Sequence, residues 1–266
     1  MLVTGATGTL GAPTVARLRT AVHDVRALSR RSGPGLTTGD LLTGAGVHEA
    51  VAGVDTVLHL ATGPRGRGDV AATRMLLEAA GDAGVRHLVL ISIVGIDDIP
   101  LGYYRDKVVI EGLIQESGLG YSILRATQFH SFVEALFTAQ RWSPIVVAPS
   151  FPLQPIAAQE VADRLVELAS GAPAGRVADI GGPQQADVSD LARLWARAGG
   201  THRPVMPLAL SGKLFAAYRA GSALVPGPAH GRQLFAEHLA ARVAASSPTP
   251  AVPGRNAGTS DQVLLP

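Results

Sequence analysis

The chain has 266 residues, with 23 Lys and Arg against 21 Asp and Glu, and 47% of its side chains are hydrophobic. This length and apolar content suffice for one large domain, or for a main domain with a smaller lobe, which excludes a disordered chain and a disulfide-stapled mini-protein. The near balance of charge argues against nucleic acid as the main partner. The absence of cysteine excludes disulfides and thiolate chemistry, and it fits a reducing compartment.

The sequence shows neither a targeting signal nor a membrane span. Residues 88–96 form the longest apolar run, which has the length of a strand rather than the ~18 residues that a span needs. Met1 leads directly into residues 2–5, with no basic region or long apolar region before them. We therefore expect a cytoplasmic protein that has no membrane partner.

Over the first 150 residues, short apolar runs alternate with segments of helical periodicity. The predicted strands are residues 2–4, 24–28, 56–60, 88–93 and 121–124. Apolar stripes within residues 73–80 and 109–114 indicate helices between them. Such alternation is typical of βαβ units, so we predict an α/β fold with a doubly wound parallel sheet that has helices on both faces. We assign residues 1–150 to this domain.

The pattern changes from about Phe151. Apolar stripes within residues 161–168 and 188–198 indicate two amphipathic helices, and residues 177–180 form a strand that could return to the sheet. We therefore predict a smaller, mostly helical lobe over residues 151–245. Residues 246–254 contain three prolines and few apolar side chains, so we expect a flexible tail over residues 246–266.

A glycine-rich turn, TGATGTLG, follows the first predicted strand and opens a helix. Gly5 would permit a tight turn, Gly8 would let the backbone approach a pyrophosphate, and Gly11 would let the helix pack closely on the strand. The spacing is GxxGxxG rather than GxGxxG, and the alternative is an ordinary glycine-containing turn. The position favours a dinucleotide site. Its expected residues are Gly5, Thr7, Gly8, Thr9, Leu10 and Gly11.

The second predicted strand ends in Ser29, Arg30 and Arg31, without a carboxylate. An acid there would bind the ribose 2′-hydroxyl of NAD(H), whereas guanidinium groups favour NADP(H). Arg30 can stack on adenine and hold the 2′-phosphate, with Ser29 as a second donor. The alternative is a solvated basic turn. Asp40 and Leu41, at the end of a third strand, are expected near the adenine edge.

Together these motifs resemble the short-chain dehydrogenase/reductase superfamily, in its extended and atypical branch of NmrA-like and isoflavone-reductase-like NAD(P)H-binding proteins. Beyond the turn, the resemblance rests on GDL at 39–41, VDTVLHLA at 54–61, ISIVG at 91–95, YYRDK at 103–107 and ILR at 123–125. It covers the chain to about residue 240. The resemblance implies a Rossmann sheet of strand order 3-2-1-4-5-6 with an appended strand, and a cofactor across the carboxyl ends of the strands.

The resemblance also implies roles for two loop segments. Ala61, Thr62 and Gly63, after the fourth strand, would line the cofactor. The segment after the sixth strand would face the substrate and the nicotinamide. Its residues are Thr127, Gln128, Phe129 and His130.

Tyr103 and Lys107 lie four residues apart, on one face of a predicted helix. The resemblance implies that this pair is catalytic. A nearby ammonium would lower the pKa of the phenol, and Lys107 would also hydrogen-bond the nicotinamide ribose. Ser92, at the end of the fifth strand, would hydrogen-bond the substrate oxygen while a hydride passes from NADPH.

Three features depart from the pattern of active family members. Ser92 precedes Tyr103 by only 11 residues. Tyr104 offers a second phenol, three residues from Lys107, and Asp69 stands where many relatives have an Asn. Asp69 could therefore pair with Lys107. Some atypical members keep the lysine, lose the rest of the chemistry and bind NADP as redox sensors.

The other titratable residues are not assigned a catalytic role. His59 is expected to be a buried strand residue. For His130 two predictions stay open, a place in the wall of the substrate pocket and a place in a loop. Asp97 and Asp98, before Pro100, predict a solvated turn. Neither an HExxH motif nor a carboxylate cluster appears in the sequence, so we expect no metal.

The leading interpretation is an oxidoreductase, an NADPH-dependent reductase of a small, fairly apolar ketone, enone, quinone or imine. It rests on the predicted site and on aromatic residues that follow the sixth strand, namely Phe129, Phe132, Phe137, Trp142 and Phe151. The second is a non-catalytic NADP(H)-sensing regulatory protein. The third is a nucleotide-sugar epimerase or dehydratase, which would normally have a longer lobe and an NAD-type acid. Relatives often associate through helices that flank the sheet, so a homodimer is also open.

Overall fold

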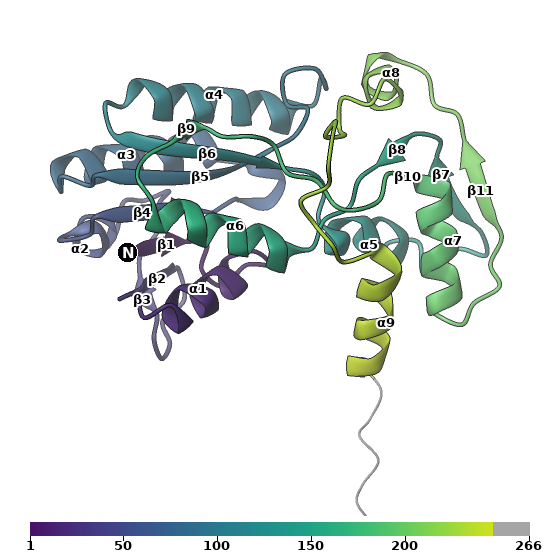
Figure 1. The fold of residues 1–266 in the computed structure, drawn as a ribbon, viewed down its shortest axis with the longest axis horizontal. Coiled ribbons are helices and arrows are strands. Elements are labelled where there is room, and N and C mark those ends of the chain that lie inside the picture. Colours follow the sequence, from purple (N-terminus) through teal and green to yellow (C-terminus); the bar gives the residue numbers. More distant parts are fainter. Residues whose placement is uncertain (247–266) are drawn as a thin grey trace, which may run out of the picture.

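The computed structural model describes residues 1–246, and within them a seven-stranded parallel sheet and a smaller lobe lie side by side (Figure 1). The strands of the sheet are β1 (Leu2–Thr4), β2 (Arg26–Ser29), β3 (Thr37–Thr38), β4 (Thr56–His59), β5 (His87–Ile93), β6 (Gly120–Ala126) and β9 (Gly175–Arg176). Their order is β3-β2-β1-β4-β5-β6-β9, and every neighbouring pair is parallel. The prediction of a Rossmann-like sheet with an appended strand is confirmed.

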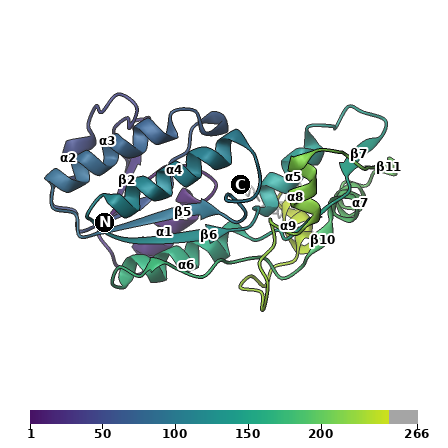
Figure 2. The ribbon, with the colours of Figure 1, turned by 90° about the horizontal axis from the view of Figure 1, so that it is seen from above.

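Helices cover both faces of this sheet. On one face lie α1 (Gly11–Thr20) and α6 (Ala158–Ser170), and on the other lie α2 (Val47–Val51), α3 (Asp69–Asp82) and α4 (Gly102–Glu116), as Figure 2 shows. Successive strand residues belong to opposite faces, so Val57 packs with α2 and α3 while Leu58 packs with α1 and α6. Because both faces are buried, the inner strands carry apolar residues at consecutive positions, as in residues 88–91 of β5.

Helix α6 packs on the sheet, although the sequence analysis assigned it to the C-terminal lobe. Its buried residues Val161 and Leu165 share a core with Val3 and Leu18. An ion pair between Arg17 and Asp163 also joins α1 to α6. A stripe of apolar residues predicts that a helix has a buried face, but it does not specify the surface that covers that face.

The lobe combines helices with two short two-stranded sheets. Its elements are α5 (His130–Thr138), β7 (Val146–Pro149), β8 (Pro152–Leu153), β10 (Ala186–Asp187), α7 (Val188–Ala198), β11 (Val205–Leu208), α8 (Lys213–Arg219) and α9 (Phe235–Ser246). Strand β7 pairs with β11 in parallel, and β8 pairs with β10 in antiparallel fashion. Phe137, Trp195 and Phe235 lie in the core of the lobe.

The two cores interleave along the chain. Helix α5 and strand β7 precede residue 150 and pack in the lobe, whereas α6 and β9 follow it and belong to the sheet. The division of the chain at residue 150 into a sheet domain and a lobe therefore stays a prediction. Except for Ser246, which ends α9, the predicted tail over residues 246–266 lies outside the described residues. Over residues 1–246, the helices are too short or too polar to cross a membrane.

The start of α1 has room for nothing larger than glycine. A Cβ atom at Gly11 would lie 2.1 Å from the carbonyl oxygen of Gly5 and 2.8 Å from Cα of Ala6. Both neighbours are backbone atoms, so neither can rotate away. The close packing of this helix on the turn before it therefore depends on residue 11.

We predict that Gly11→Ala lowers the free energy of unfolding by about 1–3 kcal/mol, because the added methyl group overpacks a rigid contact. Gly112→Ala is the matched control, since a Cβ at this position in α4 meets nothing within 4 Å. The control should raise stability by about 0.5–1 kcal/mol through helix propensity. Urea unfolding followed by circular dichroism measures both, and equal effects of the two changes would contradict the packing argument.

Candidate functional site

A cavity of about 710 Å³ opens at the carboxyl ends of the sheet strands, between the sheet and the lobe. It includes the point between β1 and β4 where the strand order reverses, which is the usual ligand crevice of such sheets. Every residue predicted to bind the cofactor lines this cavity. These residues are Gly5, Thr7, Gly8, Thr9, Leu10, Gly11, Ser29, Arg30, Asp40, Leu41, Ala61, Thr62, Gly63 and Lys107.

The glycine-rich turn brings backbone to the cavity wall. Gly5 has a φ of +65°, and a Cβ there would lie 2.7 Å from Cα of Ala61. The amide of Gly8 donates to the carbonyl of Gly5 at 3.0 Å, which closes the turn. The N-cap of α1, Leu10, forms no side-chain cap, and the first turn of α1 has no acidic residue. An anion therefore fits at this helix N-terminus.

Polar and cationic groups lie at the ends of β2 and β3. Arg30 and Arg31 are exposed and line the cavity, and the amide of Arg31 donates to the hydroxyl of Ser29 at 3.0 Å. The carboxylate of Asp40 accepts from the amide of Leu42 at 2.9 Å. This end of the cavity thus presents two guanidinium groups, which a phosphate would require. Strand β2 itself contains no carboxylate.

His59 is a structural residue, as the sequence analysis expected. Its Nδ1 lies 2.9 Å from the hydroxyl of Thr4, and its Nε2 lies 3.1 Å from the hydroxyl of Thr73. The Thr73 hydroxyl donates to the carbonyl of Asp69, so Nε2 carries the proton and Nδ1 accepts. Burial, with a smaller contribution from Lys107, lowers the pKa of His59 to about 3. The ring is therefore neutral and ties β1, β4 and α3 together.

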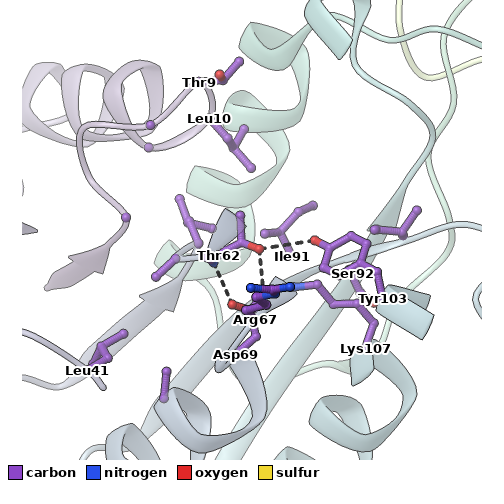
Figure 3. Close-up of a pocket in the computed structure, with 18 of the residues that line it drawn as sticks. Thr9, Leu10, Leu41, Thr62, Arg67, Asp69, Ile91, Ser92, Tyr103 and Lys107 are labelled. Carbon is purple, nitrogen blue, oxygen red and sulfur yellow. Dashed lines mark hydrogen bonds between the residues drawn. The ribbon is translucent and has the colours of Figure 1, made fainter. Parts of the chain in front are cut away.

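Asp69 organises the loop after β4. The hydroxyl of Thr62 donates to its Oδ2 at 2.6 Å, and the amide of Gly63 donates to its Oδ1 at 2.7 Å (Figure 3). The phenol oxygen of Tyr103 lies 3.4 Å from the Thr62 hydroxyl. The sequence analysis considered a pairing of Asp69 with Lys107, but the ion pairs of the described residues do not include one.

Lys107 and Tyr103 meet at the cavity, but not as the sequence predicted. The ammonium of Lys107 lies 5.7 Å from the centroid of the Tyr103 ring. Burial raises the pKa of the Tyr103 phenol, and the bond to Thr62 only partly opposes this effect. The expected lowering of the phenol pKa by Lys107 is therefore not found, because burial is the largest influence on this pKa and Lys107 is not among the groups that shift it. Tyr103 is a neutral phenol in this structure.

Lys107 is only 5% exposed. Burial lowers the pKa of its ammonium, whereas Asp69 and Glu111 raise it. Arg125 holds Glu111 through two bonds of 2.8 and 2.7 Å and also pairs with Asp97. Asp97 lies in an exposed turn, as the sequence predicts, and is also a partner of the buried Arg125.

Two buried polar side chains at the cavity have no partner within the described residues. They are the hydroxyl of Ser92, 2% exposed, and both amide atoms of Gln128, 8% exposed. Gln128 lies near enough to the hydroxyl of Tyr104 to affect its pKa, without forming a hydrogen bond of good geometry. A buried polar group without a partner costs about 1–3 kcal/mol. These groups are therefore suited to bind a ligand.

His130 does not line the cavity, whereas Gln128 and Phe129 do. Its Nε2 lies 3.1 Å from the carbonyl of Pro155, and its ring packs against Phe235 and His238 of α9. Burial, assisted by His238, lowers the pKa of His130 to about 4. The prediction that His130 faces the substrate is therefore wrong, because the first turn of α5 directs its side chain into the lobe.

Tyr218 and Arg67 are among the cavity residues that the sequence did not predict, whereas Phe132 was among the aromatic residues named for an apolar substrate. Phe132 and Tyr218 reach the cavity from the lobe, and Tyr218 lies 3.4 Å, hydroxyl to hydroxyl, from Tyr104, which is 114 residues away in sequence. Nothing in the sequence links two such distant residues. Arg67 also lines the cavity. The sequence pattern that could have predicted it is a cation between two glycines in the loop after the fourth strand.

Metal binding has no structural support in residues 1–246, where side chains of His, Asp and Glu form no group of three or more that could hold an ion.

Comparisons with known proteins agree with this geometry. A family model described as NAD(P)H-binding matches residues 5–170. The chloroplastic divinyl chlorophyllide a 8-vinyl-reductase of Oryza sativa subsp. indica is 30% identical over 222 residues, which cover 70% of this chain. The chain spans about half of that relative, since the match covers 55% of its length.

Two solved structures have a similar fold. The NADPH-dependent quinone oxidoreductase of Escherichia coli, in complex with NADPH, has a TM-score of 0.78 at 19% identity, over 91% of this chain and 99% of that one. A nucleoside-diphosphate-sugar epimerase of Staphylococcus aureus has a TM-score of 0.73 at 18% identity, over 90% and 99%. The family match, over most of the sheet, shows that the chain belongs to the NAD(P)H-binding family, and these solved structures share its fold.

Proposed function

We propose that the protein is an NADPH-dependent reductase that transfers a hydride to a small, largely apolar ketone, enone, quinone or imine. One observation carries the proposal. The glycine-rich turn, the Arg30 side chain and the trio of Ser92, Tyr103 and Lys107 all line one continuous cavity. A dinucleotide that lies along it would reach from the cationic end to the trio.

The residues present fit such a cofactor. Gly5 and Gly8 leave backbone exposed where a pyrophosphate would approach, and α1 directs its N-terminus there. Arg30 would pair with the 2′-phosphate, assisted by the Ser29 hydroxyl. Lys107 would donate to the ribose next to the nicotinamide. When bound, the reduced nicotinamide supplies the hydride.

The trio would complete the reduction at the acceptor. Ser92 has a buried hydroxyl without a partner, which is free to donate to the acceptor oxygen or nitrogen as negative charge develops there. Tyr103 would donate the proton that balances the added hydride, and its raised pKa means that it carries this proton at neutral pH. The products are the reduced substrate and the oxidised dinucleotide.

The far end of the cavity supports an apolar substrate. Leu101, Phe129, Phe132 and Tyr218 form much of its wall there, and Gln128 would provide a polar anchor. The names of two similar proteins, a vinyl-reductase and a quinone oxidoreductase, both denote redox enzymes. They support a reductase without selecting one of the four acceptor classes.

The second candidate is an NADP(H)-sensing protein without turnover. The position of the Lys107 ammonium over the Tyr103 ring favours it, because this is not the placement that an activated phenol would need. A nucleotide-sugar epimerase or dehydratase remains third, because Arg30 and Arg31 stand where an NAD-selecting acid would lie.

We predict that Tyr103→Phe reduces kcat/KM by about 10²- to 10⁴-fold, because the proton donor is lost, while the Kd for NADPH stays unchanged. The measurements are consumption of NADPH with a panel of ketones, enones, quinones and imines, and a fluorescence titration with NADPH. Tyr104→Phe is the matched control and should keep most of the activity. Full activity of Tyr103→Phe would remove Tyr103 from the mechanism, and NADPH binding without turnover on the whole panel would favour the sensor.

We predict that Arg30→Glu weakens NADPH binding by about 30- to 100-fold and leaves NADH binding nearly unchanged, since only NADPH has the 2′-phosphate. Arg105→Glu makes the same charge change at an exposed residue of α4 that does not line the cavity. Titration of both dinucleotides compares the two variants. An unchanged preference between NADPH and NADH in Arg30→Glu would refute the assignment of the 2′-phosphate.

A further inference from the structure

Residues 63–68 (GPRGRG), here called the strap, cross one side of the cavity between β4 and α3. The strap contains the short helix η1 (Pro64–Gly66). Gly63 donates its amide to Asp69, which holds the start of the strap. The strap is thus a built segment with a defined attachment at each end.

The glycines on either side of Arg67 contact side chains from two different walls of the cavity. A Cβ at Gly68 would lie 2.6 Å from Cδ2 of Leu42, beside the residues expected at the adenine. A Cβ at Gly66 would lie 2.2 Å from Cδ2 of Tyr103, beside the residues expected at the nicotinamide. Both glycines therefore allow the strap to lie flush against these side chains.

Arg67 lies between those two contacts and lines the cavity. Figure 3 shows the same arrangement, with Leu41 on one side, Tyr103 on the other and Arg67 between them. Thr9 and Leu10 of the glycine-rich turn face this region from across the cavity. The pyrophosphate joins the two halves of a dinucleotide, so it would lie between the adenine side and the nicotinamide side of the cavity.

The charges favour the same assignment. Arg67 is exposed, and its guanidinium forms no ion pair with any described residue. The nearby carboxylate of Asp69 is already held by Thr62 and Gly63. The opposite wall offers backbone amides and a helix N-terminus but no cationic side chain. A pyrophosphate there would carry two negative charges, and Arg67 is placed to balance one of them.

We propose that Arg67 binds the pyrophosphate of the dinucleotide, so that the strap and the glycine-rich turn hold it from opposite sides. This inference rests on the proposed function only in requiring that the cavity takes a dinucleotide. Because NADPH and NADH share the pyrophosphate, Arg67 contributes to affinity for both. Arg30, in contrast, contributes to the preference between them.

The test is a fluorescence titration of the full chain with NADPH and with NADH. Arg67→Gln should raise the Kd for both by about 10- to 100-fold, and Arg67→Lys should recover part of this loss because it keeps the charge. Arg74→Gln, at an exposed residue of α3 that does not line the cavity, should leave both Kd values unchanged. Added NaCl should weaken NADPH binding less in Arg67→Gln than in the unaltered protein.

Each other outcome has a distinct meaning. Unchanged binding of both dinucleotides by Arg67→Gln would overturn the inference. A loss restricted to NADPH would assign Arg67 to the 2′-phosphate instead, which also overturns it. If the unaltered protein binds neither dinucleotide, the proposed function itself fails, and circular dichroism of each variant excludes misfolding as the cause of any loss.

Discussion

The close approach of two backbone segments, at Gly5 after β1 and Ala61 after β4, is the constraint on which the site depends. No side chain fits between them. The hydroxyl of Thr4 fixes this approach, because it accepts from the amides of both Leu60 and Ala61 at 3.1 Å. The chain turns outward in opposite directions from β1 and β4, so the crevice opens where these two strands meet. The same bonds that join the strands therefore set the shape of the cavity.

The buried ammonium of Lys107 is the second organising feature. Removing a cation from water is costly unless opposite charges surround it. Asp69 and Glu111 provide such charges at some distance, and each is fixed by other partners, Asp69 by Thr62 and Gly63 and Glu111 by Arg125. Lys107 is thus stabilised by surrounding acids but not neutralised in a contact pair. Its ammonium stays available to a ligand in the cavity.

The parts of the fold that depend on local sequence could be predicted, and the parts that depend on tertiary contacts could not. The strands, the glycine-rich turn and the arginines after β2 follow from patterns within a few residues. The placement of α6 on the sheet depends on the surface that covers its apolar face. His130 and Tyr218 show the same limit at the site, since the packing of α9 directs one side chain away from the cavity and the packing of α8 brings the other to it.

The protonation of Tyr103 bears on the direction of the proposed reaction. When the substrate is reduced, the phenol must bring a proton, whereas when an alcohol is oxidised, the phenol must first have lost its proton. Burial raises the pKa of Tyr103, and its bond to Thr62, which itself donates to Asp69, uses the phenol as the donor. Asp69 adds a negative charge that further opposes the phenolate. Burial and Asp69 act in the same direction and outweigh the bond to Thr62, which lowers the pKa, so Tyr103 carries the proton that the proposed reduction requires.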